Sequence, residues 1–144
     1  MGRLMAIDYG TKRTGIAVTD TLKIIATGLA TVSSHSLINF IKEYTNKETV
    51  DCIIVGAPKQ TNNEPSENMK FVERFVRSLN KEIPEIPVKL YDERFTSVMA
   101  HKAMIDGGLK KKDRQNKALV DEISAVILLQ SYMESSFYKK GTNI

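Results

Sequence analysis

Three acidic residues stand where folding could bring their carboxylates together. Asp8 closes the apolar segment RLMAID, and Glu93 closes the segment PVKLYDE. Asp121 lies in KALVDEISAVILLQ, a long apolar run whose length and composition favour a helix. Carboxylate oxygens are the ligands that Mg²⁺ and Mn²⁺ prefer, and such ions support phosphodiester hydrolysis. We therefore take Asp8, Glu93 and Asp121 as candidate metal ligands and catalytic residues.

Asp121 is the most informative of the three, because its helix has little room for a solvated face. It shares one stripe, at spacings of three and four, with Ser124, Ala125 and Leu128. An ionised carboxylate on a helix face that packs against a sheet is costly unless a cation or hydrogen bonds compensate it. Small residues one turn later would let the helix approach the sheet closely. The alternative is that Asp121 lies at the edge of the stripe and contacts water.

The other two acids also have ordinary structural explanations. Asp is common in turns, which could account for Asp8. Asp92 competes with Glu93 for the same role, because neighbours along a strand point to opposite faces and only one can share the site. Arg94 could pair with either of them as a surface ion pair. The functional interpretation therefore depends on the three acids coming together.

Softer metal ligands are absent from the sequence pattern. There is no CxxC motif and no histidine cluster, and neither His35 nor His101 is predicted to belong to a site. The single cysteine, Cys52, lies in the apolar run CIIVG and is expected to be a buried thiol in a reducing compartment. These features leave the carboxylates as the candidate ligands.

Basic residues near the acids indicate an anionic partner, and nucleic acid is the leading candidate. The formal net charge is +4, and the pI is about 9.1. One basic pair follows Asp8 between two glycines, and the segment KKKDRQNK (110–117) precedes the helix of Asp121. The alternative for both groups is a solvated surface. The candidate contacts to backbone phosphates are Lys12, Arg13, Arg94, Lys110, Lys111, Lys112, Arg114 and Lys117.

The elements that must position these residues follow the order βββαβαβαα. Strands are predicted over 3–8, 13–20, 23–32, 51–57 and 87–93. Helices are predicted over 36–47, from about residue 65, over 96–108 and over 116–138. Short Gly-containing turns make the first three strands an antiparallel meander. Right-handed crossovers then place the fourth strand beside the first and the fifth beyond it, so that their carboxyl ends share one edge.

The chain is expected to form a single α/β domain over residues 1–144, with a five-stranded mixed sheet covered by helices on both faces. Its composition, 42% hydrophobic and 26% charged, is typical of a soluble protein. No segment has the roughly 20 apolar residues that a membrane-spanning helix needs. The first residues are not expected to form a secretory signal, because a short apolar stretch ends at Asp8. A cytoplasmic protein is therefore expected.

Four motifs in this order resemble the YqgF/RuvX family of bacterial ribonuclease H-like proteins, whose members are described as Holliday-junction resolvases and as pre-16S ribosomal RNA nucleases. The motifs are DYGTKRTGIAVTD (8–20), VGAP (55–58), DERFTS (92–97) and, after the basic segment, VDEISAVILLQ (120–130). The resemblance spans about residues 4–133. It implies a ribonuclease H-like fold, Asp8, Glu93 and Asp121 as the catalytic acids, and Lys12, Arg13 and Arg94 near the bound backbone.

The function expected from the residues and the resemblance is that of a hydrolase, an endonuclease dependent on Mg²⁺ or Mn²⁺ that processes pre-16S ribosomal RNA in ribosome biogenesis. One alternative is a Holliday-junction resolvase acting on branched DNA, which normally requires a C2 dimer. No dimer helix is evident, so a monomer or weak homodimer is expected. Another alternative is a non-catalytic nucleic-acid-binding module of the same fold.

An actin-like sugar kinase or ATPase is a further alternative, because DYGT at 8–11 matches the DxGT pattern of their phosphate-binding hairpin. Those proteins close a nucleotide between two such domains, and 144 residues supply only one. The choice between RNA and DNA and the number of metal ions stay open. With the fourth strand between the first and fifth, Asp8 and Glu93 begin about 10 Å apart, so one metal site is easier to build than two.

Overall fold

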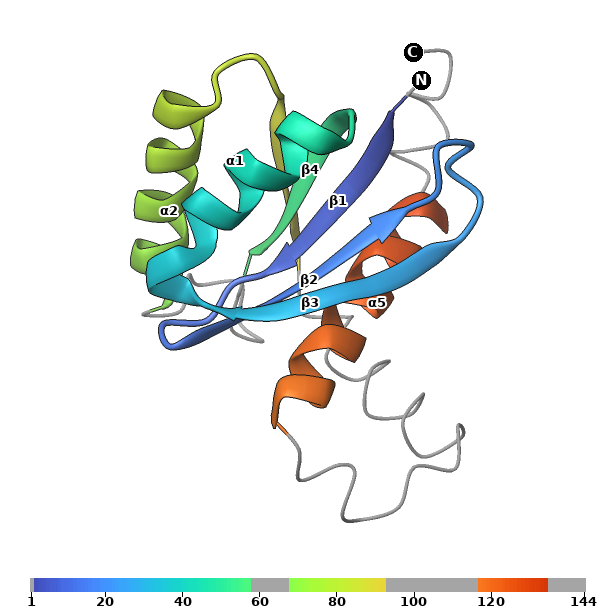
Figure 1. Ribbon diagram of the computed structural model, residues 1–144. Helices are drawn as coiled ribbons and strands as arrows, with labels where there is room; N and C mark the ends of the chain where they lie inside the picture. The colour runs from blue at the N-terminus through green and yellow to red at the C-terminus, as the bar shows by residue number, and fades with distance from the viewer. Residues whose placement is uncertain (1, 58–67, 93–116, 135–144) are drawn as a thin grey trace.

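A five-stranded mixed sheet lies at the centre of the computed structural model, which describes residues 2–57, 68–92 and 117–134 (Figure 1). The strands are β1 (Arg3–Asp8), β2 (Arg13–Thr19), β3 (Ala26–Ser33), β4 (Val50–Ala57) and β5 (Val88–Asp92). Their order in the sheet is β3-β2-β1-β4-β5. The first three strands pair antiparallel, and β4 and β5 add in parallel beside β1. The predicted meander and crossovers are confirmed.

Helices cover both faces of this sheet, as expected (Figure 1). A short 3-10 helix, η1 (Ser34–Ser36), leads into α1 (Leu37–Lys47), which lies with α2 (Asn68–Glu82) on one face. The other face is covered by α5 (Lys117–Glu134). The helix predicted over 96–108 lies outside the described residues. None of the helices in the described part of the chain is long and apolar enough to cross a membrane.

Alternation along β1 explains why the sheet is buried on both sides. Met5 and Ile7 pack against α1 and α2, whereas Leu4 and Ala6 pack against α5. All four side chains are less than 5% exposed. A strand covered on both faces needs a nearly continuous apolar run, which is the pattern of RLMAID. The small side chain of Ala6 belongs to the face on which α5 lies close to the sheet.

The third strand begins at Ala26 rather than at residue 23 as predicted. The Asp20 carboxylate accepts hydrogen bonds from the backbone N–H groups of Leu22, Ile24 and Ile25, at 3.2, 2.8 and 2.8 Å. These bonds, that of Ile25 foremost, lower the pKa of Asp20. Lys23 takes a positive φ of 58° within this turn. Local side-chain bonds therefore replace the strand ladder that the β-branched residues favoured.

The predicted burial of the cysteine is confirmed. Cys52 lies in β4 on the face that α5 covers, and only 8% of its surface is exposed. Burial raises the pKa of its thiol, so the side chain is neutral and weakly nucleophilic at neutral pH. Its role here is packing.

Candidate active site

Asp8 lies at the end of β1 on the side of the sheet that faces α5. Leu4 and Ala6, four and two residues earlier in the same strand, pack against α5, and alternation gives Asp8 the same side. The antiparallel register pairs Asp8 with Gly15 of β2. Asp8 is partly buried. The first predicted acid is therefore next to Gly15, at the edge where β1 ends.

Asp121 reaches the same place from α5, because Gly15 lets the helix backbone touch the sheet. A Cβ atom at Gly15 would lie only 2.0 Å from the backbone oxygen of Asp121. No side chain fits in that space without moving the helix. Residues 8 and 121 both adjoin Gly15, so two of the three predicted acids are brought to one site. The close approach that the small residues of the helix predicted is confirmed.

The side chain of Asp121 is partly exposed and is paired with a cation. Its Oδ2 atom accepts a hydrogen bond of 3.1 Å from Nε of Arg13. The two side chains are 26% and 42% exposed, respectively. Ala125 and Leu128 on the same stripe are fully buried, which confirms the predicted helix face. Asp121 thus lies at the edge of the stripe and contacts solvent, as the alternative interpretation expected, and Arg13 is its partner there.

Ser34, which is not among the predicted site residues, positions the turn that carries the basic pair. Its hydroxyl donates a hydrogen bond to the backbone oxygen of Gly10, and its backbone N–H donates to that of Lys12 at 3.0 Å. The Ser34 hydroxyl also lies 2.9 Å from Oγ1 of Thr14. These bonds hold the turn that carries the exposed residues Lys12 and Arg13, and Arg13 pairs with Asp121. Only long-range hydrogen bonds show this role, and no local sequence signal marks it.

The parallel strands align the ends of β1 and β5 at one edge. Val55 of β4 pairs with Ile7 on one side and with Leu90 on the other. Asp8 follows Ile7 directly, and β5 ends at Asp92, two residues after Leu90. The end of β4 lies between these two strand ends, as the sequence analysis expected.

Several predicted site residues fall outside the described part of the chain. These are Glu93, Arg94, Lys110, Lys111, Lys112 and Arg114. Lys117 begins α5, but its side chain is not among those described. Within the described residues, no three His, Cys, Asp or Glu side chains are placed to hold a metal ion together. Asp8 and Asp121 belong to the described residues, whereas Glu93 does not.

A family model described as "RuvX: Holliday junction resolvase" matches residues 2–135 of the chain. This chain belongs to the RuvX family. Relatives at high identity are described as "Putative pre-16S rRNA nuclease". One from Phocaeicola vulgatus is 67% identical over 138 residues, covering 96% of this chain and 99% of the relative. One from Flavobacterium psychrophilum is 54% identical over 133 residues, covering 92% and 97%.

Two solved structures of RuvC have the same fold as this chain. The structure titled "T. thermophilus RuvC in complex with Holliday junction substrate" matches with a TM-score of 0.57 at 18% identity, covering 99% of this chain and 98% of that one. A second Thermus thermophilus RuvC structure matches with a TM-score of 0.58 at 16% identity, covering 97% of each. The ribonuclease H-like fold is therefore confirmed in its RuvC-like form.

Proposed function

We propose that this chain is a divalent-metal-dependent endonuclease that hydrolyses phosphodiester bonds in pre-16S ribosomal RNA. The observation that carries the proposal is the meeting of Asp8 and Asp121 at Gly15, with Arg13 beside them. Asp8, Arg13 and Asp121 come from three different elements and meet at the edge where open α/β sheets bind ligands. The description of relatives that share 67% identity supports RNA as the substrate.

The chemistry of the described side chains fits a hard divalent cation. Asp8 and Asp121 offer carboxylate oxygens, which suit Mg²⁺ or Mn²⁺. Asp8 and Asp121 would hold the ion together with Glu93. A bound divalent ion supplies an activated water and stabilises the departing oxygen of the phosphodiester. Arg13, with a partly exposed guanidinium beside Asp121, would bind a phosphate of the substrate strand.

The inclusion of Glu93 is supported by the residues that precede it in the sequence. Tyr91 packs on the α5 side of the sheet, where its hydroxyl lies 3.0 Å from Oγ of Ser131. Its ring contacts that of Tyr132 edge-to-face, with centroids 5.8 Å apart. Residues two apart in a strand share a face, and Glu93 is the second residue after Tyr91 in the sequence, so we expect it on the face that carries Asp8 and Asp121.

Cleavage assays with two substrates test this proposal. The purified chain is incubated with precursor 16S ribosomal RNA or with a four-way DNA junction, in EDTA, Mg²⁺ or Mn²⁺. We expect cleavage of the RNA that requires the metal and stops in EDTA. Preferential cleavage of the junction would replace RNA by branched DNA as the substrate. RNA binding without any cleavage would favour the non-catalytic nucleic-acid-binding module. Cleavage that persists in EDTA would contradict the proposed dependence on a divalent metal ion.

Arg13→Ala tests whether the basic pair contacts nucleic acid. We expect weaker RNA binding. We also expect a shallower plot of log affinity against log salt concentration, with a slope reduced by the amount that about one phosphate contact contributes. The free energy of unfolding should change by less than about 1 kcal/mol, because the ion pair with Asp121 is partly exposed. Filter binding across a salt series and urea unfolding measure the two quantities.

Lys42→Ala is the matched control. Lys42 is also 42% exposed and pairs with Glu82 on the other face of the sheet. Its removal should leave RNA affinity and the salt slope close to those of the parent protein. If Arg13→Ala and Lys42→Ala have equal effects on binding, Arg13 has no specific contact.

A further inference from the structure

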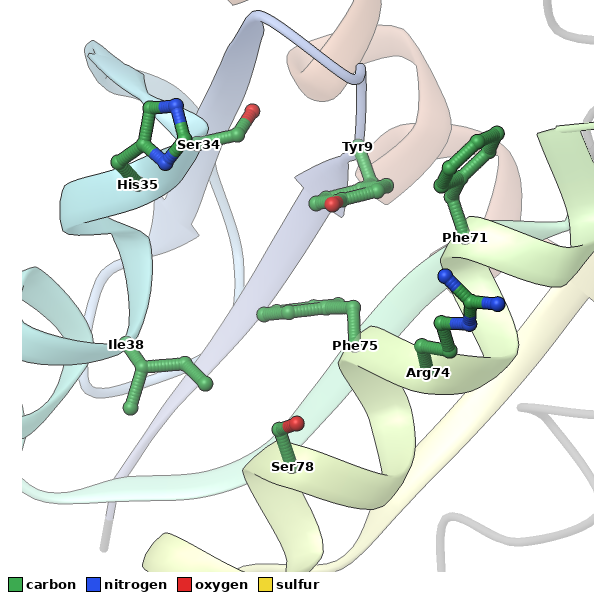
Figure 2. A pocket seen from close by; sticks show the side chains of 8 residues that line it. All are labelled: Tyr9, Ser34, His35, Ile38, Phe71, Arg74, Phe75 and Ser78. Atoms are coloured by element: carbon green, nitrogen blue, oxygen red, sulfur yellow. The ribbon is translucent and has the colours of Figure 1, made fainter.

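A cavity of about 220 Å³ opens on the opposite face of the sheet from the proposed cleavage site (Figure 2). One wall is α2, which contributes Phe71, Arg74 and Phe75. The facing wall is formed by His35 of η1 and by α1. Tyr9, the residue directly after β1, projects between the two walls (Figure 2). The cavity is smaller than the roughly 300–1,000 Å³ of pockets that hold drug-sized ligands, so it suits a group the size of one base.

Aromatic rings make up much of the cavity. The ring of Tyr9 stacks on that of Phe75, with centroids 4.9 Å apart and an interplanar angle of 7°. This stack fixes the orientation of Tyr9. The ring of Phe71 is 42% exposed at the cavity, although a phenyl group gains by leaving water. Planar apolar surface is therefore available to a planar ligand.

A cation accompanies the rings. The guanidinium of Arg74 lies 6.0 Å from the centroid of the Phe71 ring. Within the described part of the chain, Arg74 makes no ion pair with an acid. Its guanidinium is thus available for a phosphate or for the edge of a base. Aromatic faces combined with arginine are the means by which proteins hold unstacked bases of single strands.

The cavity is linked to the proposed site through the turn after β1. Asp8 lies on the α5 side, and Tyr9, the next residue, lies on the side of α1 and α2. Ser34, which also lines the cavity, binds the backbone of Gly10 and Lys12 in the same turn. An RNA strand that crosses this edge of the sheet can therefore reach both the cavity and the proposed cleavage site.

We propose that this cavity holds one unstacked base of the single-stranded RNA whose phosphodiester lies at Asp8 and Asp121. The inference rests on the proposed function and adds a binding subsite to it. Phe71 and Tyr9 supply the stacking surface, and Arg74 supplies the contact to the phosphate or base edge.

The absence of tryptophan from the chain allows a direct test. Phe71→Trp introduces a single tryptophan at the cavity, and its emission can be excited apart from that of the five tyrosines. We expect its fluorescence to be quenched by single-stranded oligoadenylate and unchanged by an abasic oligomer of the same length and charge. Asn80→Trp, at an exposed position of α2 away from the cavity, is the control and should respond to neither. Equal responses of the two reporters would overturn the proposal.

Affinity provides the second measurement. Phe71→Ala should weaken binding of oligoadenylate roughly 5- to 100-fold, the range typical of base–aromatic stacking, and leave binding of the abasic oligomer unchanged. Ile24→Ala removes another exposed apolar side chain, 66% accessible in the β2–β3 turn, and should alter neither affinity. Circular dichroism checks that each variant is folded. Equal weakening for both oligomers, or none, would exclude a base at this cavity.

These measurements are made in EDTA, which separates the inference from the proposed function. Quenching and base-dependent affinity without any metal-dependent cleavage would support the subsite and contradict the nuclease. Metal-dependent cleavage with no base-dependent response at Phe71 would support the nuclease and contradict the subsite.

Discussion

Asp8→Asn and Asp121→Asn should each lower metal-dependent RNA cleavage by more than about 100-fold. Loss of even an outer partner of a metal ligand typically costs 10- to 100-fold in affinity or activity, and these two residues are proposed as direct ligands. Asparagine keeps the size of the side chain and removes the negative charge. Since the contact with Gly15 is made by the backbone of Asp121, the fold should persist. Initial cleavage rates at saturating Mg²⁺ and thermal unfolding curves measure both effects.

RNA affinity in EDTA provides a further readout that misfolding would not reproduce. It should be unchanged or higher in both variants, because a negative charge near the phosphates has been removed. Calorimetric titration with Mn²⁺ should show a matching loss of metal affinity. Variants that cleave at the parent rate, in preparations cleared of contaminating nucleases, would contradict the assignment of these acids.

Glu122→Gln is the matched control for charge on α5. Glu122 is the neighbour of Asp121 in the helix, but its side chain lies over Gly28 of β3 rather than over Gly15. The same loss of one negative charge should therefore leave the cleavage rate close to that of the parent protein. If Glu122→Gln lowers the cleavage rate as much as Asp121→Asn does, the effect of Asp121→Asn comes from the negative charge of the helix and not from the loss of a metal ligand.

Gly15→Ala should destabilise the protein strongly, by about 1–3 kcal/mol or more. The new methyl group would lie 2.0 Å from the backbone oxygen of Asp121, and that atom can move only if α5 moves. A backbone shift of about 1 Å can cost 100-fold in rate, so activity should fall beyond the loss of stability. Urea unfolding gives the change in midpoint at constant slope, and cleavage is measured at a temperature where the variant is folded.

Gly28→Ala is the matched control, because it tests whether a clash with the backbone of α5 causes the destabilisation expected for Gly15→Ala. Its methyl group would lie 2.5 Å from Oε1 and 2.7 Å from Cγ of Glu122, which are atoms of a flexible side chain that can rotate away. The free energy of unfolding should change by no more than about 0.5 kcal/mol, as is usual where nothing rigid is displaced. If both alanine variants unfold at the same urea concentration, the close approach of α5 at Gly15 is not a determinant of stability.

Much of the architecture could be predicted because it follows from local patterns and general rules of connection. The alternating and continuous apolar segments predicted all five strands, and the handedness of crossovers predicted their order. The first strand has the predicted bounds, and Asp8 ends it. The third strand begins three residues later than predicted, because the hydrogen bonds of Asp20 to nearby amides outweigh β propensity there.

Of the candidate site, the sequence determined which residues carry charge and on which element each one stands. It identified Asp8 at a strand end and Asp121 on a buried helix stripe, because spacing alone defines a strand or helix face. The roles of all the candidate site residues stay predictions, and Glu93 and most of the basic residues also lie outside the described residues.

Only the tertiary structure decided how those residues meet. The contact of Asp121 with Gly15, the ion pair with Arg13 and the stack of Tyr9 on Phe75 each join segments far apart in the chain. Such contacts depend on strand register and on how closely a helix packs against a sheet. Neither quantity is contained in local spacing, because register and packing distance are set by side chains on both partners at once.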